Sequence, residues 1–346
     1  MELDARKLQI LKAIIDEYVT SASPVGSRAI SKREGFHLSS ATIRNEMADL
    51  EELGYLEQPH TSAGRIPSDK AYRLYVDRIM HRADLTNDEI KVIRTHFSTR
   101  CDAVESVMKQ AAQALSDVTQ YTAVVLPPML VANRLKHIQL VPLREGRALL
   151  LVVTDAGYAR DAIVPIPDGM DADELERISR MLTERYRDCR MDVLAERIPA
   201  EMGQVLYERR VFLNTMVEAL EHRIDAGAHG VEFAGATNIL HYPEYSDVNK
   251  AKTFLAAVEA RDTMYDMLRK ASKVEFTITI GNENESEALR DCSVITAAYR
   301  LGDESMGTFG VIGPTRMQYG KVISVLEYMR MGLRELLRNS IEEDKG

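Results

Sequence analysis

The sequence predicts a multidomain α+β protein that begins with a winged helix-turn-helix. Its 346 residues exceed the size at which one hydrophobic core usually stops growing, so two or three domains are expected. A capped helix at residues 40–53 runs directly into a short hairpin with polar and basic residues at its tip. Further along, segments of period two or of continuous apolar residues alternate with helical segments, which predicts sheets packed against helices.

Two predicted helices precede the one at residues 40–53. Residues 7–19 carry apolar side chains at helical spacing and predict a buried first helix through Leu8, Leu11, Ile14, Ile15 and Tyr18. Pro24 and Gly26 then break the chain, and Ser27 can cap a short helix that ends near Gly35. Two helices and a tight connection therefore come before the candidate DNA-reading helix.

The helix at residues 40–53 has one apolar stripe and one face of small residues. Ser39 and Ser40 can cap it by accepting hydrogen bonds from unpaired backbone N–H groups, and Gly54 ends it. The stripe that should face the core is Ile43, Met47 and Leu50, with Leu53 at its margin. The residues that face away from that core are Ala41, Asn45 and Ala48.

An outward face of this kind is typical of a helix that enters the major groove of duplex DNA. Small residues let the backbone approach the floor of the groove, so we assign Thr42, Arg44 and Asn45 to base recognition. Ser39 and Ser40 are assigned to positioning on phosphate or on the groove backbone. An ordinary amphipathic surface helix would show the same apolar stripe, and the neighbouring helices and hairpin favour DNA binding over it.

Two short extended segments at residues 55–58 and 65–66 flank the loop PHTSAG, in which Pro59 and Gly64 favour a turn. The polar side chains of this loop can donate to phosphate, and Arg65 can contact the DNA backbone or enter the adjacent minor groove. The complete predicted DNA-binding set is Arg28, Ser39, Ser40, Thr42, Arg44, Asn45, His60, Thr61, Ser62 and Arg65.

The charge balance predicts selective rather than indiscriminate binding to nucleic acid. The formal net charge is −9, and residues 1–80 are nearly neutral, with 11 Lys and Arg against 12 Asp and Glu. Two positive patches flank the candidate DNA-reading helix, at residues 26–44 (net +3) and 60–73 (net +2). Few phosphate contacts predict weak non-specific binding, so specificity would depend on base contacts and on two half-sites.

The chain resembles the HrcA family of bacterial heat-inducible transcription repressors in SSATIRNEMADLEELGYLEQPHTSAGRIPSDKAYRLYVD, residues 39–77. Three distal segments are also similar to motifs of that family: IGNENE at 280–285, DCSVITAAY at 291–299 and FGVIGPTRMQYGKVI at 309–323. The resemblance covers essentially the whole chain. It implies a homodimer that represses heat-shock operons, depends on chaperonin for its active fold and is released on heat shock.

The rest of the chain predicts an α+β domain interrupted by a mostly helical insertion. The polar linker HRADLTND ends in a capping box, Thr86 to Glu89, and a helical segment follows to residue 119. The predicted boundaries are 1–82 for the winged helix-turn-helix, 83–103 for a linker and connecting helix, 104–168 with 273–346 for a discontinuous domain, and 169–272 for the insertion. The resemblance implies that the discontinuous domain is GAF-like and that the insertion mediates dimerisation.

No motif for catalysis, a cofactor or a metal is found. The sequence lacks H-E-x-x-H, G-x-S-x-G and a dinucleotide fingerprint, and GPTRMQYGKVI fails the phosphate-loop pattern at Thr315 and Val322. Cys101, Cys189 and Cys292 are an odd number and widely spaced, which predicts buried thiols in a reducing compartment. Without an apolar leader or spanning segment, we expect a cytoplasmic protein that is neither an enzyme nor bound to a membrane.

Three functional hypotheses from different classes remain open. The first is a homodimeric repressor that pairs its two reading helices on an inverted repeat in double-stranded DNA. The second is a ligand-responsive regulator whose GAF-like domain binds a small metabolite. The third is an enzyme with an accessory DNA-binding domain, for which the sequence offers no clear catalytic residues.

Overall fold

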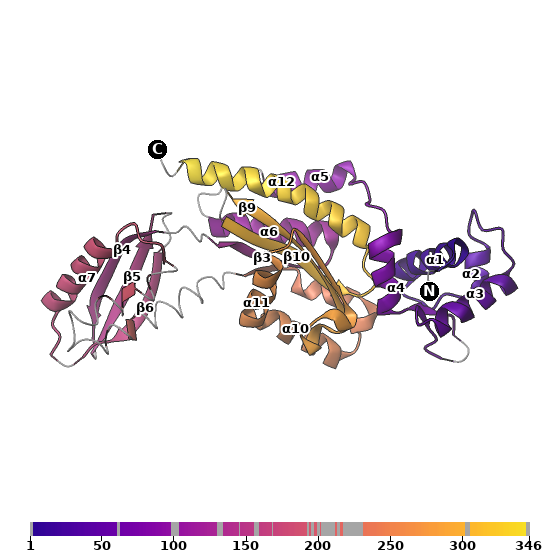
Figure 1. Cartoon of the computed structure of the whole chain (residues 1–346), viewed down its shortest axis with the longest axis horizontal. Coiled ribbons are helices and arrows are strands. Elements are labelled where there is room, and N and C mark those ends of the chain that lie inside the picture. Colours follow the sequence, from indigo (N-terminus) through magenta and orange to yellow (C-terminus); the bar gives the residue numbers. More distant parts are fainter. Residues whose placement is uncertain are drawn as a thin grey trace.

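Figure 1 shows the computed structural model, an elongated molecule with three bodies along its long axis. Helices α1 to α4 lie at one end, a five-stranded sheet between helices lies in the middle, and a three-stranded sheet lies at the other end. The structure describes residues 3–343 except 61–62, 98–103, 130–133, 145, 156–158, 168, 192–193, 195–196, 199–200, 202–211, 213–214, 217–230 and 302–304.

The N-terminal unit, residues 3–79, is a small helical body with a two-stranded hairpin. Its elements are α1 (Ala5–Ser21), α2 (Ser27–Ser31), α3 (Ser40–Glu52), β1 (Leu56–Glu57), β2 (Ile66–Pro67), α4 (Asp69–Leu74) and a π-helical turn (Tyr75–Ile79). Asp4, Ser39 and Ser68 each accept a backbone hydrogen bond that caps α1, α3 and α4 respectively. The buried side chains shared by α1 and α3 include Ile10, Leu11, Ile14, Ile43, Met47 and Leu50.

The central domain is built on an antiparallel sheet with the strand order β7-β3-β10-β9-β8. Its strands are β3 (Thr122–Met129), β7 (Glu232–Ala234), β8 (Phe276–Ile280), β9 (Cys292–Leu301) and β10 (Ser305–Pro314). Its helices are α5 (Asn87–Phe97), α6 (Val104–Thr119), α10 (Val248–Glu259), α11 (Arg261–Ala271) and α12 (Tyr319–Glu343). Short 3-10 turns are η3 (Ala236–His241), η4 (Pro243–Tyr245), η5 (Gly281–Glu283) and η6 (Glu287–Leu289).

Both faces of the central sheet are buried. Successive residues of a strand point to opposite faces, so neighbouring residues of β3 pack into two different apolar clusters. In β3, Ala123 and Val125 belong to the apolar cluster that includes α6 and α12. Val124 and Leu126, on the other face, belong to the cluster that includes α10 and α11. The near-continuous apolar sequence of β3 is therefore that of a strand covered on both sides.

The distal domain contains the antiparallel strands β4 (Leu135–Leu143), β5 (Arg147–Thr154) and β6 (Ala159–Pro165), covered on one face by α7 (Ala172–Tyr186). Two hydroxyls on α7 accept backbone hydrogen bonds from β4: Ser179 from the Leu140 N–H at 2.8 Å, and Thr183 from the Ile138 N–H at 3.0 Å. On the opposite face, Leu149 pairs with Val141 on one side and with Ile163 on the other.

The domain boundaries predicted for residues 104–346 are wrong in two places. Strands β4 to β6, expected in the discontinuous domain, form their own sheet and share a core with α7. Residues 232–271, expected in the insertion, supply β7 and the helices that cover the central sheet. The chain thus leaves the central domain after β3 and returns at β7, and the inserted part contains a sheet. Alternating hydrophobicity identifies a strand but not the sheet that it joins.

The linker between the N-terminal unit and the central domain packs against α12. The predicted capping box is confirmed, since the Glu89 N–H donates to Thr86 Oγ1 at 3.3 Å and the Thr86 N–H donates to Glu89 Oε2 at 2.9 Å. Glu89 also pairs with Lys321 on α12 at 2.6 Å. The helical segment expected up to residue 119 consists of two helices, α5 and α6.

Candidate nucleic-acid interface

The outward face of α3 is exposed as its periodicity predicts. Arg44 and Asn45 are exposed, whereas Ile43 and Met47 are buried against the rest of the N-terminal unit. Thr42 lies beside the start of the helix, where its hydroxyl is 2.9 Å from that of Ser39. The three side chains assigned to base recognition therefore come from one turn of one helix and lie close together.

Ser39 and Ser40, both assigned to DNA positioning, also have local structural contacts. Ser39 Oγ accepts from the Thr42 N–H at 3.1 Å and is the N-cap of α3. Ser40 Oγ lies 3.0 Å from the hydroxyl of Ser27 at the start of α2. This contact joins the N-terminal ends of α2 and α3, so Ser40 fixes the relative position of the two helices.

The β1–β2 hairpin is held beside α2 by backbone hydrogen bonds. The Val25 N–H donates to the Arg65 carbonyl at 2.8 Å, and the Arg65 N–H donates to the Val25 carbonyl at 2.9 Å. Gly64 lies so close to this contact that a Cβ atom added there would be 2.5 Å from the Val25 carbonyl carbon. His60 is exposed at the tip of the hairpin, and Thr61 and Ser62 lie outside the described residues.

Arg65 differs from the expectation that its side chain would reach toward DNA. Its Nε donates to Glu51 Oε2 at 2.8 Å, and the side chain is only 19% exposed. The charged group of Arg65 thus ties the hairpin to the end of α3. No pattern in the sequence identifies Glu51 as this partner, because the two residues lie 14 positions apart with no periodicity connecting them.

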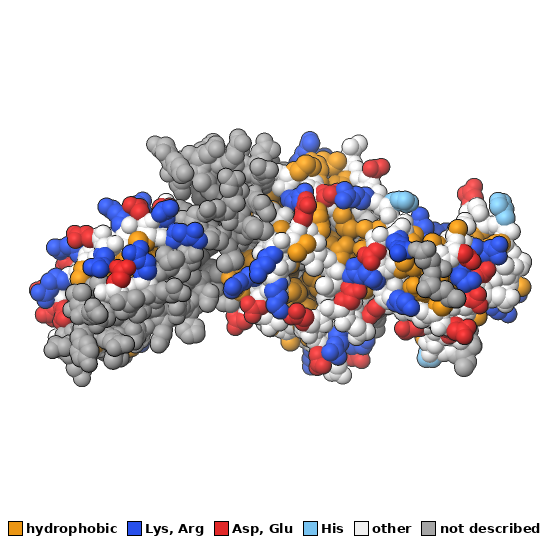
Figure 2. Space-filling view, in the orientation of Figure 1, with side chains coloured by type: hydrophobic (Ala, Val, Ile, Leu, Met, Phe, Trp, Pro, Cys, Tyr) orange, Lys and Arg blue, Asp and Glu red, His pale blue; other side chains and the backbone are white. Residues whose placement is uncertain are grey.

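A groove of about 530 Å³ lies between the start of α2, the middle of α3 and the hairpin. Arg28, Arg44 and Arg65 line it from these three elements, and none of the described lining residues is acidic. Figure 2 shows basic and acidic side chains interspersed over the rest of the visible surface of this unit. The groove is therefore a local positive site suited to phosphate on a nearly neutral body.

The N-terminal unit contacts the central domain through two of the distal sequence motifs. In the first, the Asn282 N–H donates to Asp69 Oδ2 at 3.0 Å, and Glu283 forms an ion pair with Arg73 of α4. Arg73 also donates to the Ile278 carbonyl at 2.6 Å. Burial alone would raise the pKa of Glu283, but the hydrogen bonds from Arg73 and from the backbone hold that pKa below its ordinary value.

In the motif at residues 309–323, Arg316 is only 8% exposed and joins three segments of the chain. Its guanidinium donates to the Val19 carbonyl of α1 at 3.0 Å, pairs with Glu244, and lies over the ring of Tyr242. The segment that follows strand β10 is therefore part of the contact with α1. No sequence pattern connects Arg316 with these partners, because Val19, Tyr242 and Glu244 are remote from it in the sequence.

Comparison with known proteins identifies relatives that share nearly the whole sequence of this chain. A family model described as the HrcA protein C terminal domain matches residues 105–323. Curated relatives named heat-inducible transcription repressor HrcA include one from Brevibacillus brevis, 41% identical over 99% of this chain and 100% of its own length, and one from Halalkalibacterium halodurans, 42% identical over 99% of both chains. A third, from Ruminiclostridium cellulolyticum, is 42% identical over 95% of this chain and 96% of its own.

A solved crystal structure of a hypothetical protein has the same fold, with a TM-score of 0.60 and 22% sequence identity over 98% of this chain and 100% of its own. Fold, groove and relatives together define the chain as a mixed α+β regulator of transcription rather than an enzyme. The chain belongs to the HrcA family. The resemblance noted in its sequence is thereby confirmed.

Neither a membrane-spanning helix nor a metal site is found in the part of the chain that the structure describes. None of its helices is both long and apolar enough to cross a membrane. No group of three or more His, Cys, Asp or Glu side chains in it is arranged to hold a metal ion.

Proposed function

We propose that this protein is a homodimeric repressor that binds an inverted-repeat operator in front of chaperone or chaperonin operons. The N-terminal unit acts as a winged helix-turn-helix, with α3 in the major groove and the hairpin against the neighbouring backbone. The observation that carries the proposal is the exposed face of α3 beside an arginine-lined groove, in a chain whose relatives are named transcription repressors.

The side chains of the interface have different roles in this proposal. Thr42, Arg44 and Asn45 contact base edges, because they share the exposed first turns of α3. Arg28 contacts phosphate from the other wall of the groove, together with the polar residues of the hairpin tip. Arg65 holds the hairpin against α3 through Glu51 and thereby sets the position of that tip.

The proposed dimer brings two such units together through the distal domain. The face of its sheet opposite α7 carries Val141 and Leu143, each 41% exposed, and Ile163, which is 57% exposed. A contiguous apolar face of this kind favours burial against a second copy. Two-fold symmetry would then require a palindromic operator, with half-sites about 10 bp or a multiple of it apart.

Heat acts indirectly in this proposal, through chaperonin in the cytoplasm. Unfolded proteins occupy the chaperonin on heat shock, so newly made or denatured repressor does not reach its DNA-binding fold. The central sheet supports this idea, because β3 pairs with β7 and β10, whose residues follow more than a hundred positions later. Such non-local pairing folds slowly and exposes apolar surface meanwhile. We assign the central domain, which contains this sheet, as GAF-like.

The test is a gel shift of the purified full chain on a palindromic duplex taken from upstream of a chaperone operon. A single half-site and a scrambled duplex serve as competitors, and each reaction is run with and without chaperonin. We expect sequence-selective binding that needs both half-sites and that chaperonin increases.

Salt-sensitive binding that ignores the sequence would overturn the operator assignment. A chain that refolds completely and binds its operator equally well without chaperonin would overturn the heat-sensing part alone. Selective binding to a tandem repeat without inverted symmetry would contradict the symmetric dimer.

A further inference from the structure

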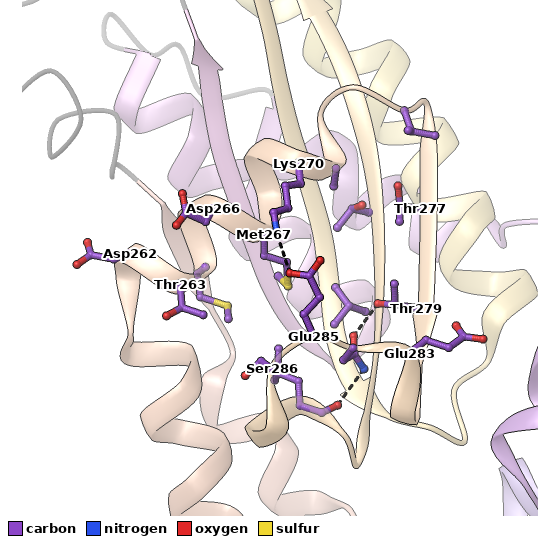
Figure 3. Close-up of a pocket in the computed structure, with 17 residues that line it drawn as sticks. Asp262, Thr263, Asp266, Met267, Lys270, Thr277, Thr279, Glu283, Glu285 and Ser286 are labelled. Atoms are coloured by element: carbon purple, nitrogen blue, oxygen red, sulfur yellow. Dashed lines mark hydrogen bonds and ion pairs between the residues drawn. The ribbon is translucent and has the colours of Figure 1, made fainter.

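A cavity of about 540 Å³ lies in the central domain between α11 and the edge strand β8 (Figure 3). Its volume is within the range of pockets that hold small molecules, about 300–1,000 Å³. The cavity is separate from the candidate nucleic-acid interface, and the proposed function gives it no role.

The floor of the cavity is apolar. Met264, Leu289 and Val294 line it and are each no more than 3% exposed, and Ala271 beside them is 9% exposed. One polar neighbour, Asn284, already has its amide engaged, since its oxygen accepts from Thr279 and its two N–H donors are shared among three backbone carbonyls. This floor suits a compact hydrocarbon body that leaves water on binding.

The mouth of the cavity carries a surplus of negative charge. Figure 3 shows Asp262 and Asp266 along α11, with Glu285 across from them. The lining carboxylates are Asp262, Asp266, Glu283 and Glu285, against one ammonium group, Lys270. Lys270 already pairs with Glu285 at 2.6 Å, and that carboxylate raises the lysine pKa. With Lys270 paired to Glu285 and Arg73 paired to Glu283, the exposed Asp266 adds negative charge at the mouth, which therefore favours a cation over an anion.

We propose that this cavity binds a small organic cation, an amine with a compact apolar body. The apolar body lies on the floor formed by Met264 and Leu289, and the ammonium group lies at the mouth near Asp266. A carboxylate ligand of the same shape is repelled there, because the lining carries more negative than positive side chains.

One short segment joins this cavity to the DNA-binding unit. Glu285 pairs with Lys270 at the mouth, while the adjacent Asn282 and Glu283 hold Asp69 and Arg73 on α4. Helix α4 directly follows strand β2 of the hairpin. A ligand that moves residues 282–285 would thus bias the position of the hairpin, so occupancy changes operator affinity. This consequence rests on the proposed function.

The first experiment measures binding to the full chain by isothermal titration calorimetry, with phenethylammonium as the probe and phenylacetate as the matched anion. We expect saturable binding of the cation and none of the anion. Replacing both Asp262 and Asp266 by Asn should weaken binding about tenfold, since each exposed charge contributes about threefold. Ala271→Phe fills the floor and should abolish binding.

The control variant is Glu176→Gln on α7 of the distal domain, which should bind the probe as the unchanged chain does. The thermal transition of Ala271→Phe is checked separately, and the aspartate variants decide the question if that chain does not fold. Absence of cation binding, equal binding of both probes, or binding insensitive to the aspartate changes would overturn the proposal.

The second experiment measures operator affinity with and without phenethylammonium. We expect a change of severalfold that Asn282→Ala reduces, because this variant removes a contact between the cavity segment and α4. Probe binding without any change in operator affinity would overturn the coupling and leave the cavity assignment standing. A chain that binds no operator would instead contradict the proposed function, and calorimetry would still decide the cavity.

Discussion

Asn45 and Arg316 show how exposure decides what a single residue can do. Asn45 is exposed on α3, so its truncation leaves the core intact and alters only what the helix touches on a partner. Arg316 is nearly buried and has its hydrogen-bonding groups engaged by α1 and Glu244. Substitutions at these two positions should therefore change different properties, recognition in one case and stability in the other.

Asn45→Ala should relax the preference for one base position of the operator and weaken specific binding by about 1–3 kcal/mol. The reason is that an amide reads a base edge through two hydrogen bonds, which alanine cannot make. Binding assays on operators mutated one position at a time check this. Asn249→Ala, at another exposed asparagine on α10, is the control and should bind normally. An equal loss on every sequence would reassign Asn45 to DNA positioning.

Arg316→Ala should lower the free energy of unfolding by about 2–3 kcal/mol, because it leaves the Val19 carbonyl and Glu244 without their cationic partner. Chemical denaturation of the full chain measures the change. The matched variant is Arg180→Ala, whose ion pair with Glu176 is exposed and whose loss should cost less than about 0.5 kcal/mol. Equal effects of the two variants would contradict the structural role of Arg316.

At the scale of elements, the hairpin and α5 are each positioned by one close contact. The hairpin depends on the backbone approach between Gly64 and Val25. Helix α5 depends on Glu89, which both closes the capping box and pairs with Lys321 of α12. Each contact can be removed without changing the rest of the element.

Gly64→Ala should displace the hairpin from α2 and destabilise the chain by about 1–3 kcal/mol, the usual cost of an added group in a packed site. A methyl group there meets backbone atoms of Pro24 and Val25, which cannot rotate away as a side chain can. Thermal unfolding and operator binding both report the effect. Gly26→Ala, where no atom lies within 4 Å of the added carbon, should cost less than about 1 kcal/mol.

Glu89→Gln should reduce stability at pH 7 by about 0.5–1 kcal/mol, and this reduction should shrink as the pH falls below 4.5. Lys321 and the Thr86 N–H lower the pKa of Glu89 below its ordinary value of 4.5. A lowered carboxylate pKa gives stability that is present above the ordinary value and lost as the pH falls through the folded-state value. Glutamine keeps the capping hydrogen bond but not the charge. A stability difference that does not shrink as the pH falls would point to the cap instead.

For the molecule as a whole, dimerisation should depend on the open face of the distal sheet. Ile163→Lys places a charge on its most exposed apolar residue and should weaken dimer formation on the order of tenfold or more. Sedimentation measurements test this, and binding to the palindrome should weaken in parallel. Val248→Lys on α10, where the side chain is 64% exposed, is the control. An unchanged dimer in Ile163→Lys would place the contact elsewhere.

The sequence alone predicted the elements whose pattern is local. The apolar stripe of α3, the cap at Ser39 and the capping box at Thr86 all depend on residues within four positions of one another. The same periodicity identified Arg44 and Asn45 as outward-facing. These features follow from the geometry of one turn of helix and need no knowledge of remote partners.

Only the tertiary structure decided which segments share a core and which side chains meet across domains. The strand pattern of β5 was clear from its sequence, yet its place in a separate sheet was not, because alternation gives no information about the partner strand. Likewise Arg65 with Glu51, and Arg316 with Val19, are pairs that the chain brings together only after folding. Contacts between residues far apart in the sequence are set by how whole elements pack, which no short pattern of residues records.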